Sequence, residues 1–282
     1  MLIGLIGHPV AHSKSPEMQN AAFAHVGLSD WRYELWDTPP EMLPARMRTL
    51  SEREDVAGCN VTIPHKQAVM PYLNVVSEHA RAIGAVNTIF KRGRYLLGDN
   101  TDWTGFLADL AFHGVDVNEE TRALVLGAGG SARAIVYALA SRGARVWVHN
   151  RTPARAYALL DDLANSPYLR EIRENCAVVA SPVEPACREA NLIVNCTSAG
   201  MWPHEDGSPW PDDVPFPAGA VLYDLVYKPR VTKLMRHAEA AGARAIGGIG
   251  MLAEQGAAAF EKWTGVPAAR VSAIMRKAIA QP

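Results

Sequence analysis

The sequence predicts an α/β protein built from two α/β domains, and three observations support this prediction. The chain has 282 residues, roughly two domains of typical size. Hydrophobic residues make up 49% of it and charged residues 20%, a globular composition that can form a sizeable core. Short apolar strands alternate with helical segments in each half, an order typical of sheets with helical crossovers.

The first domain starts with strands and helices in alternation. We expect Ser15 to be the N-cap of the first helix, with Pro16 at its first helical position. The β-α-β-α-β order favours parallel strands joined by helical crossovers. The expected strands are 2–6, 31–36 and 56–62, and the expected helices are 15–27 and 39–50.

The rest of the first domain has a less regular pattern. Residues 64–83 have a helical pattern that is interrupted near Pro71. Two short strands, 86–90 and 94–97, flank a Lys-Arg-Gly turn, which predicts a hairpin. A further helix begins near Thr101–Asp102.

An apolar strand, a glycine-rich turn and a helix open the second domain. Residues 202–217 are rich in proline and polar side chains, which predicts a surface loop. Two amphipathic helices, 251–263 and 271–280, end the chain, and periodicity leaves open whether they pack on the second domain or return to the first. The expected strands are 122–126, 144–148, 177–180, 192–194 and 221–225, with helices before residue 141 and after Thr152–Pro153.

Charge and motif content argue against several classes of protein. The chain has 28 Lys and Arg against 29 Asp and Glu, a net charge of −1, without the basic excess of a nucleic-acid binder. No apolar run approaches the roughly 18 residues of a membrane helix, and the N-terminus lacks a signal-peptide pattern, so we expect a cytoplasmic protein. The four cysteines form no C-x-x-C pair and H-E-x-x-H is missing, so no metal site is expected.

A glycine-rich turn between an apolar strand and a helix points to a dinucleotide. The stretch Gly127-Ala128-Gly129-Gly130-Ser131-Ala132 has the G-x-G-x-x-A form. The first glycine allows the tight turn, the second lets the backbone approach a pyrophosphate, and the small Ala132 allows close helix packing. We therefore expect a Rossmann domain with the diphosphate at the helix N-terminus.

The end of the next strand indicates which dinucleotide is bound. NAD sites usually have an Asp or Glu here for the ribose 2′-hydroxyl, whereas this strand ends in Asn150-Arg151-Thr152, followed by Arg155. The two arginines are four residues apart and can face one spot at a helix start. Guanidinium groups suit a phosphate dianion, so the pattern favours NADP.

Polar residues gather after the strands of the first domain, where open α/β sheets bind ligands. Most are hydroxyl and amide side chains, a set that suits a small polyhydroxylated molecule. Taken alone, Ser15 and Asp102 are also typical helix caps and Lys66 a typical surface residue, so the site hypothesis depends on their convergence. The residues are Ser13, Ser15, Asn60, Thr62, His65, Lys66, Asn87, Asp99, Asn100, Thr101 and Asp102.

In these motifs the chain resembles the shikimate dehydrogenase family. The glycine-rich turn is unspecific, but S-x-S, NVT-x-P-x-K and GDNTD together are specific. The similarity follows the family order over nearly the whole chain, in GLIGHPVAHSKSP, NVTIPHK, IGAVNTI, GDNTDW, GAGGSARA, NRTPARA, NCTSAGM, YDLVYKP and GIGMLAEQGAAAFEKWTG.

The resemblance implies a role for each candidate residue. Lys66 and Asp102 are the implied catalytic pair. The implied substrate-binding residues are Ser13 and Ser15 for a carboxylate, Thr62, Asn87 and Gln255 for ring hydroxyls, and Tyr227 near the carboxylate. The implied NADP-binding residues are Gly127, Ala128, Gly129, Gly130, Ser131, Ala132, Asn150, Arg151, Thr152 and Arg155, with Thr197, Leu225, Gly248 and Met251 on the nicotinamide side.

The resemblance also implies a reaction and a domain arrangement. The reaction is the reversible NADPH-dependent reduction of 3-dehydroshikimate to shikimate, in the route to chorismate and aromatic amino acids. Residues 1–102 with 249–282 would bind the substrate, residues 103–248 would form the Rossmann NADP domain, and a cleft would lie between them. The expected partners are these small molecules, without nucleic acid or membrane, and the chain is expected to be a monomer or a homodimer.

Three other functions are compatible with parts of the sequence. The first is a quinate or dual quinate/shikimate dehydrogenase that uses NAD, although retention of both serines of S-x-S favours shikimate. The second is a non-catalytic ligand-binding module, which is expected to have lost Lys66 or Asp102. The third is a folate-linked dehydrogenase, which would not need S-x-S together with GDNTD.

Overall fold

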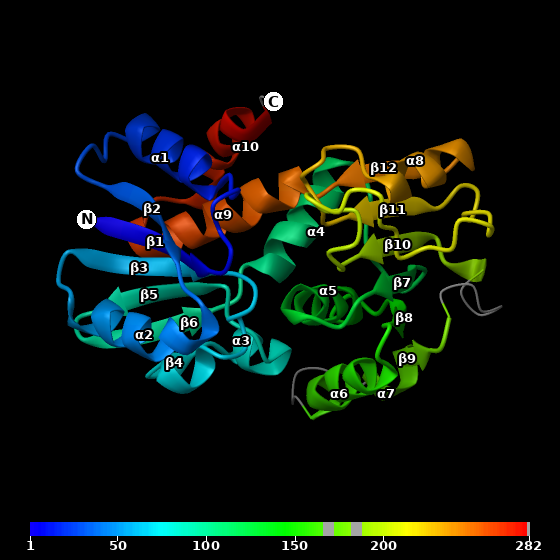
Figure 1. The fold of residues 1–282 in the computed structure, drawn as a ribbon, viewed down its shortest axis with the longest axis horizontal. Helices are drawn as coiled ribbons and strands as arrows, with labels where there is room; N and C mark the ends of the chain where they lie inside the picture. Colours follow the sequence, from blue (N-terminus) through cyan, green and yellow to red (C-terminus); the bar gives the residue numbers. More distant parts are fainter. Residues whose placement is uncertain (166–171, 182–187, 281–282) are drawn as a thin grey trace. The chain divides into compact units, whose positions relative to one another are not determined.

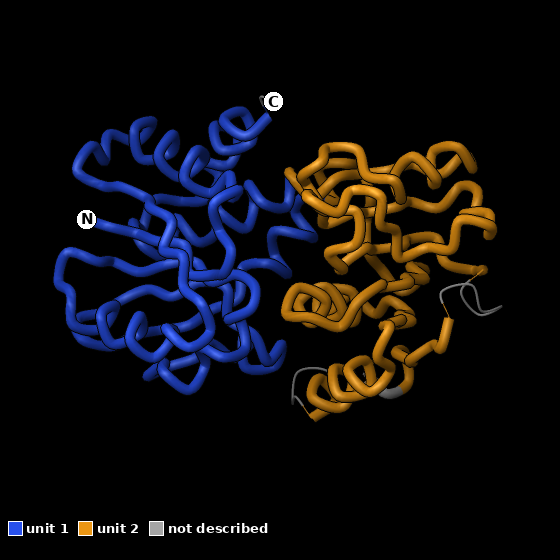
Figure 2. The backbone as a smooth tube through the Cα atoms, viewed as in Figure 1, with its two compact units in different colours: residues 1–109, 250–282 blue, residues 110–249 orange. Residues whose placement is uncertain are grey.

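The computed structural model describes residues 1–165, 172–181 and 188–280. The chain divides into two compact units (Figure 2). Unit 1 consists of residues 1–109 and 250–282, and unit 2 consists of residues 110–249. Each unit contains a six-stranded sheet with helices packed on it, so the predicted α/β class with two α/β units is confirmed.

Unit 1 has a mixed sheet with the strand order β2-β1-β3-β5-β6-β4. As predicted, β1 is parallel to both β2 and β3, and the hairpin of β5 and β6 is antiparallel. Strand β3 is antiparallel to β5, so β3 and β6 end at the same edge. The elements are β1 Leu2–Gly7, α1 Ser15–His25, β2 Arg32–Asp37, α2 Leu43–Glu52, β3 Val56–Val61, β4 Val75–Val76, α3 Glu78–Ile83, β5 Thr88–Arg92, β6 Tyr95–Asp99, α4 Asp102–Phe112, α9 Ile249–Thr264 and α10 Ser272–Ala280.

Helices cover both faces of the unit 1 sheet (Figure 1). Helix α2 packs Met47 and Leu50 into a buried cluster that includes Ile6. On the other face, α1 meets α9, where the rings of Phe23 and Phe260 lie 5.0 Å apart. Helix α10 packs against α1, so both C-terminal helices belong to unit 1, a point that periodicity left open.

Unit 2 has a parallel sheet with the order β12-β11-β10-β7-β8-β9. The chain first builds outward from β7 through β8 to β9 and then returns to place β10 on the other side of β7. This reversal creates a topological switch point at the carboxyl ends of β7 and β10, where such sheets bind ligands. The elements are β7 Arg122–Leu126, α5 Gly130–Ala140, β8 Arg145–His149, α6 Pro153–Ala164, α7 Ile172–Asn175, β9 Cys176–Val179, β10 Leu192–Asn195, β11 Val221–Asp224, α8 Lys233–Ala240 and β12 Arg244–Gly247.

Several local predictions were wrong. The first half of residues 64–83 is not a helix but turns with a short 3₁₀ helix at Met70–Tyr72. Helix α8 and strands β4 and β12 were not predicted. Residues 202–217 are irregular as expected, but Trp210 and Phe216 in this loop are buried in the core of unit 2.

No helix within residues 1–165, 172–181 and 188–280 is both long enough and apolar enough to cross a bilayer.

Candidate active site

A buried ion pair lies at the carboxyl edge of the unit 1 sheet. Lys66 follows β3, and Asp102 is the first residue of α4, three residues after the end of β6. The Lys66 Nζ lies 2.7 Å from Asp102 Oδ2, and the two residues are only 9% and 4% exposed. The Asp102 carboxylate therefore pairs with this lysine.

Two amides extend the ion pair. Asn87 precedes β5 and donates from Nδ2 to Asp102 Oδ1 over 2.9 Å. The same nitrogen lies 3.2 Å from Oε1 of Gln255, which comes from α9. Segments far apart in the sequence thus bring Lys66, Asn87, Asp102 and Gln255 into one buried polar group.

Two serine hydroxyls lie at the same edge of the sheet, after β1. Ser13 Oγ lies 3.1 Å from Ser15 Oγ and accepts the backbone N–H of Ser15 over 3.2 Å. Ser15 is the first residue of α1 rather than its N-cap, because Lys14 occupies the cap position. The prediction that Ser15 caps this helix is wrong, and its hydroxyl contacts the Ser13 hydroxyl instead.

The other predicted substrate residues lie in two places. Thr62 is half-buried directly after β3, the strand next to β1, so it shares an edge with the serines. Tyr227 follows β11 in unit 2. Its assignment to the substrate carboxylate stays a prediction.

The glycine-rich turn leads into a helix with an open N-terminus. Gly127 has a φ of +113°, and a Cβ on it would lie 3.2 Å from the backbone of Cys196 and from the Thr197 side chain. Gly129 precedes α5, and no heavy atom lies within 4 Å of a Cβ placed there. The turn is thus tight where the strands meet and open where backbone N–H groups face outward, as a diphosphate site requires. Ala128, Gly130 and Ser131 are half-buried around it, and Ala132 is buried.

The predicted 2′-phosphate site lies at the end of β8. Arg151, Thr152 and Arg155 are exposed at the start of α6, and Asn150 Nδ2 donates to the backbone carbonyl of Thr152 over 2.8 Å. Asn150 thus shapes the turn with its side chain. The two exposed guanidinium groups, with no carboxylate at the strand end, fit a 2′-phosphate better than a free ribose hydroxyl.

The predicted nicotinamide-side residues lie on neighbouring elements of unit 2, except Met251, which is buried in α9. Thr197 follows β10 at the switch point. Leu225 follows β11, and a Cβ on Gly248 would collide with the Leu225 carbonyl oxygen, so only glycine fits there.

A buried polar pair that was not predicted from the sequence precedes Thr197 and Leu225 along the chain. Asn195 and Asp224 face each other across β10 and β11, and Asn195 Nδ2 donates to Asp224 Oδ1 over 2.9 Å. Asn195 Oδ1 also accepts both the N–H and the hydroxyl of Thr197, at 2.9 and 2.7 Å. A polar residue ending each of two apolar strands was the available signal.

Asp224 is fully buried and is surrounded by neutral donors. Burial raises the pKa of its carboxyl, while hydrogen bonds from Thr232 Oγ1, the Val226 N–H and Asn195 partly offset this shift. The pair orders the loop that carries Thr197.

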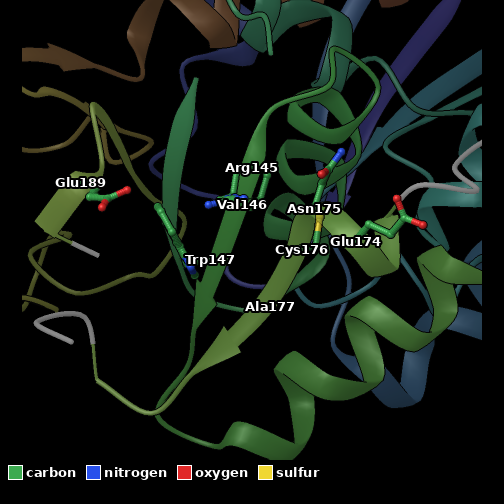
Figure 3. A pocket seen from close by; sticks show the side chains of 8 residues that line it. All are labelled: Arg145, Val146, Trp147, Glu174, Asn175, Cys176, Ala177 and Glu189. Atoms are coloured by element: carbon green, nitrogen blue, oxygen red, sulfur yellow. The ribbon is translucent and has the colours of Figure 1, made fainter. Parts of the chain in front are cut away.

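A cavity of about 300 Å³ lies elsewhere, at the opposite edge of the unit 2 sheet (Figure 3). It is lined at the starts of β8 and β9 by residues that include Arg145, Trp147 and Cys176. Burial raises the pKa of the Cys176 thiol to about 12, which makes it a poor nucleophile near neutral pH. Cys187 lies outside the described residues, and among the residues described no cluster of His, Cys, Asp and Glu suits a metal ion.

Three family models match the chain in order. The shikimate dehydrogenase substrate binding domain matches residues 5–89, shikimate / quinate 5-dehydrogenase matches residues 109–200, and the shikimate 5'-dehydrogenase C-terminal domain matches residues 248–279.

Curated proteins and solved structures agree with these matches. Shikimate dehydrogenase (NADP(+)) of Symbiobacterium thermophilum is 45% identical over 94% of this chain and 89% of its own length. That of Salinibacter ruber is 45% identical over 98% of this chain and 96% of its own. The crystal structure of the Thermus thermophilus shikimate 5-dehydrogenase in complex with NADP(H) and shikimate has a TM-score of 0.84 and 39% identity, and the match covers 99% of this chain and all of that one.

Proposed function

The chain belongs to the shikimate dehydrogenase family, and on this premise we propose that it catalyses the reversible NADPH-dependent reduction of 3-dehydroshikimate to shikimate. The observation that carries the proposal is the buried ion pair of Lys66 and Asp102, 2.7 Å apart at the carboxyl edge of the unit 1 sheet. A non-catalytic module is expected to have lost Lys66 or Asp102, and both are present in this chain.

The proposed chemistry adds a hydride to a ketone carbon and a proton to its oxygen. Bound NADPH would supply the hydride. Lys66, as an ammonium, can stabilise the negative charge that develops on the oxygen and can donate the proton. Asp102 pairs with Lys66 and can accept a hydrogen bond from a neighbouring substrate hydroxyl. In the oxidation direction the same pair takes up the proton.

Substrate recognition is assigned to the polar residues around this pair. The Ser13 and Ser15 hydroxyls suit a carboxylate, because they can donate two hydrogen bonds from adjacent positions. Thr62, Asn87 and Gln255 are assigned to ring hydroxyls, and Tyr227 is assigned to the carboxylate. This set is neutral apart from the ion pair, as a polyhydroxylated ring requires.

NADP binding is assigned to unit 2. The open N-terminus of α5 and the surrounding residues 127–132 would hold the diphosphate, and Arg151 with Arg155 would hold the 2′-phosphate. Asn150 and Thr152 shape that turn, and Thr197, Leu225, Gly248 and Met251 are assigned to the nicotinamide side. A cytoplasmic location and a monomeric or homodimeric state also remain proposals.

The decisive experiment crosses two acids with two cofactors. Purified protein is given shikimate or quinate together with NADP or NAD, and formation of reduced nicotinamide is followed by its absorbance. We expect the highest kcat/KM with shikimate and NADP. Faster turnover of quinate with NAD would assign the chain to the alternative dehydrogenase, and no turnover in any of the four mixtures would refute the proposed function.

A further inference from the structure

A chain of hydrogen-bonded, buried polar side chains leads to Asp102 from β2, the strand at one edge of the unit 1 sheet. Tyr33 on β2 donates its hydroxyl to Asn60 Oδ1 over 2.8 Å, and Asn60 Nδ2 lies 3.2 Å from Thr88 Oγ1. Thr88 donates to Asn87 Oδ1 over 2.9 Å, and Asn87 donates to Asp102. We call these five residues the polar relay. All are at most 5% exposed, so these contacts are shielded from bulk solvent.

At two places, a backbone group that can only donate or only accept a hydrogen bond fixes the orientation of an amide in the relay. Asn60 Nδ2 also lies 3.2 Å from the backbone carbonyl of Asn87, which can only accept, so the Asn60 oxygen faces Tyr33. Asn87 Oδ1 lies 2.8 Å from the backbone N–H of Thr101, which can only donate, so the Asn87 nitrogen faces Asp102. Each amide therefore has one orientation.

Thr88 is the link between these two fixed amides. It lies opposite Asn60 in the antiparallel pair of β3 and β5, is fully buried, and its hydroxyl accepts from Asn60 and donates to Asn87. Among the side chains that fit here, only a hydroxyl both accepts and donates at one atom. The hydrogen bonds thus run from Tyr33 to Asp102 in a single direction.

Resting on the proposed function, we propose that Thr88 is a positioning residue, whose hydroxyl, together with the Thr101 N–H, holds the Asn87 amide so that it donates to the Asp102 carboxylate beside Lys66. A donor aimed at Asp102 Oδ1 stabilises the ionised form and opposes the protonated one. An ionised Asp102 in turn favours the ammonium form of Lys66, which the reaction needs.

The groups around Asp102 make the relay relevant to pH dependence. Its carboxylate contacts Lys66 and Asn87, and its backbone N–H donates to Asn100 Oδ1 over 3.0 Å. The other charges nearby are on Asp99, which is paired with Lys262 of α9 at 2.7 Å, and His79 of α3 packs against Trp103 next to Asp102. Thr88 itself does not titrate, so its replacement changes the field at Asp102 without removing a charge.

The test compares Thr88→Val with Thr88→Ser. Valine keeps the branched shape and loses the hydroxyl, whereas serine keeps the hydroxyl. For Thr88→Val we expect kcat to fall about twofold to tenfold, the contribution of one buried hydrogen bond. In a plot of kcat against pH, we expect the acidic limb of this variant to lie about 0.3 to 1 pH unit higher than that of the wild type. Thr88→Ser should restore the wild-type limb. An unmoved limb in Thr88→Val, or an equal shift in both variants, would overturn the proposal.

Two further variants separate positioning from stability. Thr232→Val removes a buried hydroxyl that caps α8 in unit 2, and we expect it to lower stability without moving the acidic limb. Tyr33→Phe removes the hydroxyl at the start of the relay, and we expect a smaller shift in the same direction as Thr88→Val. If Thr88→Val does not fold, an unshifted Tyr33→Phe overturns the proposal.

A readout without turnover keeps this inference distinct from the proposed function. Hydrogen exchange at the Asn87 side-chain amide, identified with Asn87→Asp, is followed by NMR in the wild type, in Thr88→Val and in Thr88→Ser. We expect faster exchange in Thr88→Val than in the other two proteins, even in the absence of substrate. If the wild type reduces no dehydroshikimate, the proposed function fails, whereas equal exchange in all three proteins contradicts the polar relay alone.

Discussion

Two buried aspartates, Asp102 in unit 1 and Asp224 in unit 2, lie at the carboxyl ends of strands, and the groups around them differ in charge. Asp102 follows β6 in unit 1 and contacts the ammonium of Lys66 at 2.7 Å. Asp224 ends β11 in unit 2, is fully buried, and is held by the Thr232 hydroxyl, the Asn195 amide and the Val226 N–H. A cation faces the first carboxylate, whereas the three donors described at the second are neutral.

This difference separates a group that can take part in proton transfer from one that fixes a loop. A buried carboxylate beside an ammonium forms a pair whose proton can be exchanged with a substrate. A buried carboxylate among neutral donors is instead destabilised in its charged form, and burial raises the pKa of Asp224 accordingly. The comparison therefore predicts that chemistry depends on the unit 1 pair and that the unit 2 aspartate affects stability.

The largest effect is expected from Lys66→Ala. It removes the proton donor and leaves Asp102 buried without its cation, so kcat should fall about 10²- to 10⁴-fold, the usual contribution of a general acid–base group. Steady-state rates with shikimate and NADP measure this, with circular dichroism to confirm folding. Asp224→Asn is the matched control and should leave kcat nearly unchanged. A loss below tenfold in folded Lys66→Ala would remove Lys66 from the chemistry.

A smaller effect is expected from Arg151→Ala at the cofactor end of unit 2. Loss of a charged hydrogen bond to the 2′-phosphate should weaken NADP about 10- to 100-fold and leave NAD nearly unaffected. Dissociation constants for both cofactors, measured by fluorescence titration, report this. Arg145→Ala is the control, because Arg145 is also exposed but begins the same strand at its other end. Equal weakening of both cofactors would reject the 2′-phosphate assignment.

The fold was predictable wherever an apolar run coincided with a whole strand, as in β1, β7 and β8. Residues 64–77 were not, because their spacing of apolar residues fits a helix, whereas their backbone groups are hydrogen-bonded to residues in and beside the strands of the sheet. The Asn74 N–H donates to the Leu96 carbonyl, and the Lys66 carbonyl accepts from Val86. Such tertiary hydrogen bonds override local periodicity and cannot be read from it.

The candidate site divides in the same way. Lys66 and Asp102 could be selected from residue type and position after strands, and the structure brings them together. Thr88 could not, because a threonine at a strand start is typical of any sheet, and its contact with Asn60 depends on the register of β3 against β5. Asp224 was missed for a similar reason, since its partner Asn195 lies opposite it on β10.

The smallest effect expected is on stability, and it comes from Asp224→Asn. Burial raises the pKa of the Asp224 carboxyl. The folded protein therefore keeps the proton of this carboxyl to a higher pH than the unfolded chain, which releases it at about pH 4. Above that pH the unfolded state binds fewer protons than the folded state, so this group makes the free energy of unfolding fall as pH rises. Asparagine does not titrate and keeps an oxygen for Asn195 and Val226.

The wild type should therefore lose stability relative to Asp224→Asn as the pH is raised from about 4, until the pH passes the raised pKa of Asp224. Urea unfolding of both proteins at a series of pH values measures this difference. Asp206→Asn, at an exposed aspartate of the same unit, is the control and should show a constant difference from the wild type. A difference for Asp224→Asn that stays constant, or that shifts in favour of the wild type as the pH rises, would show that the donors around Asp224 outweigh its burial.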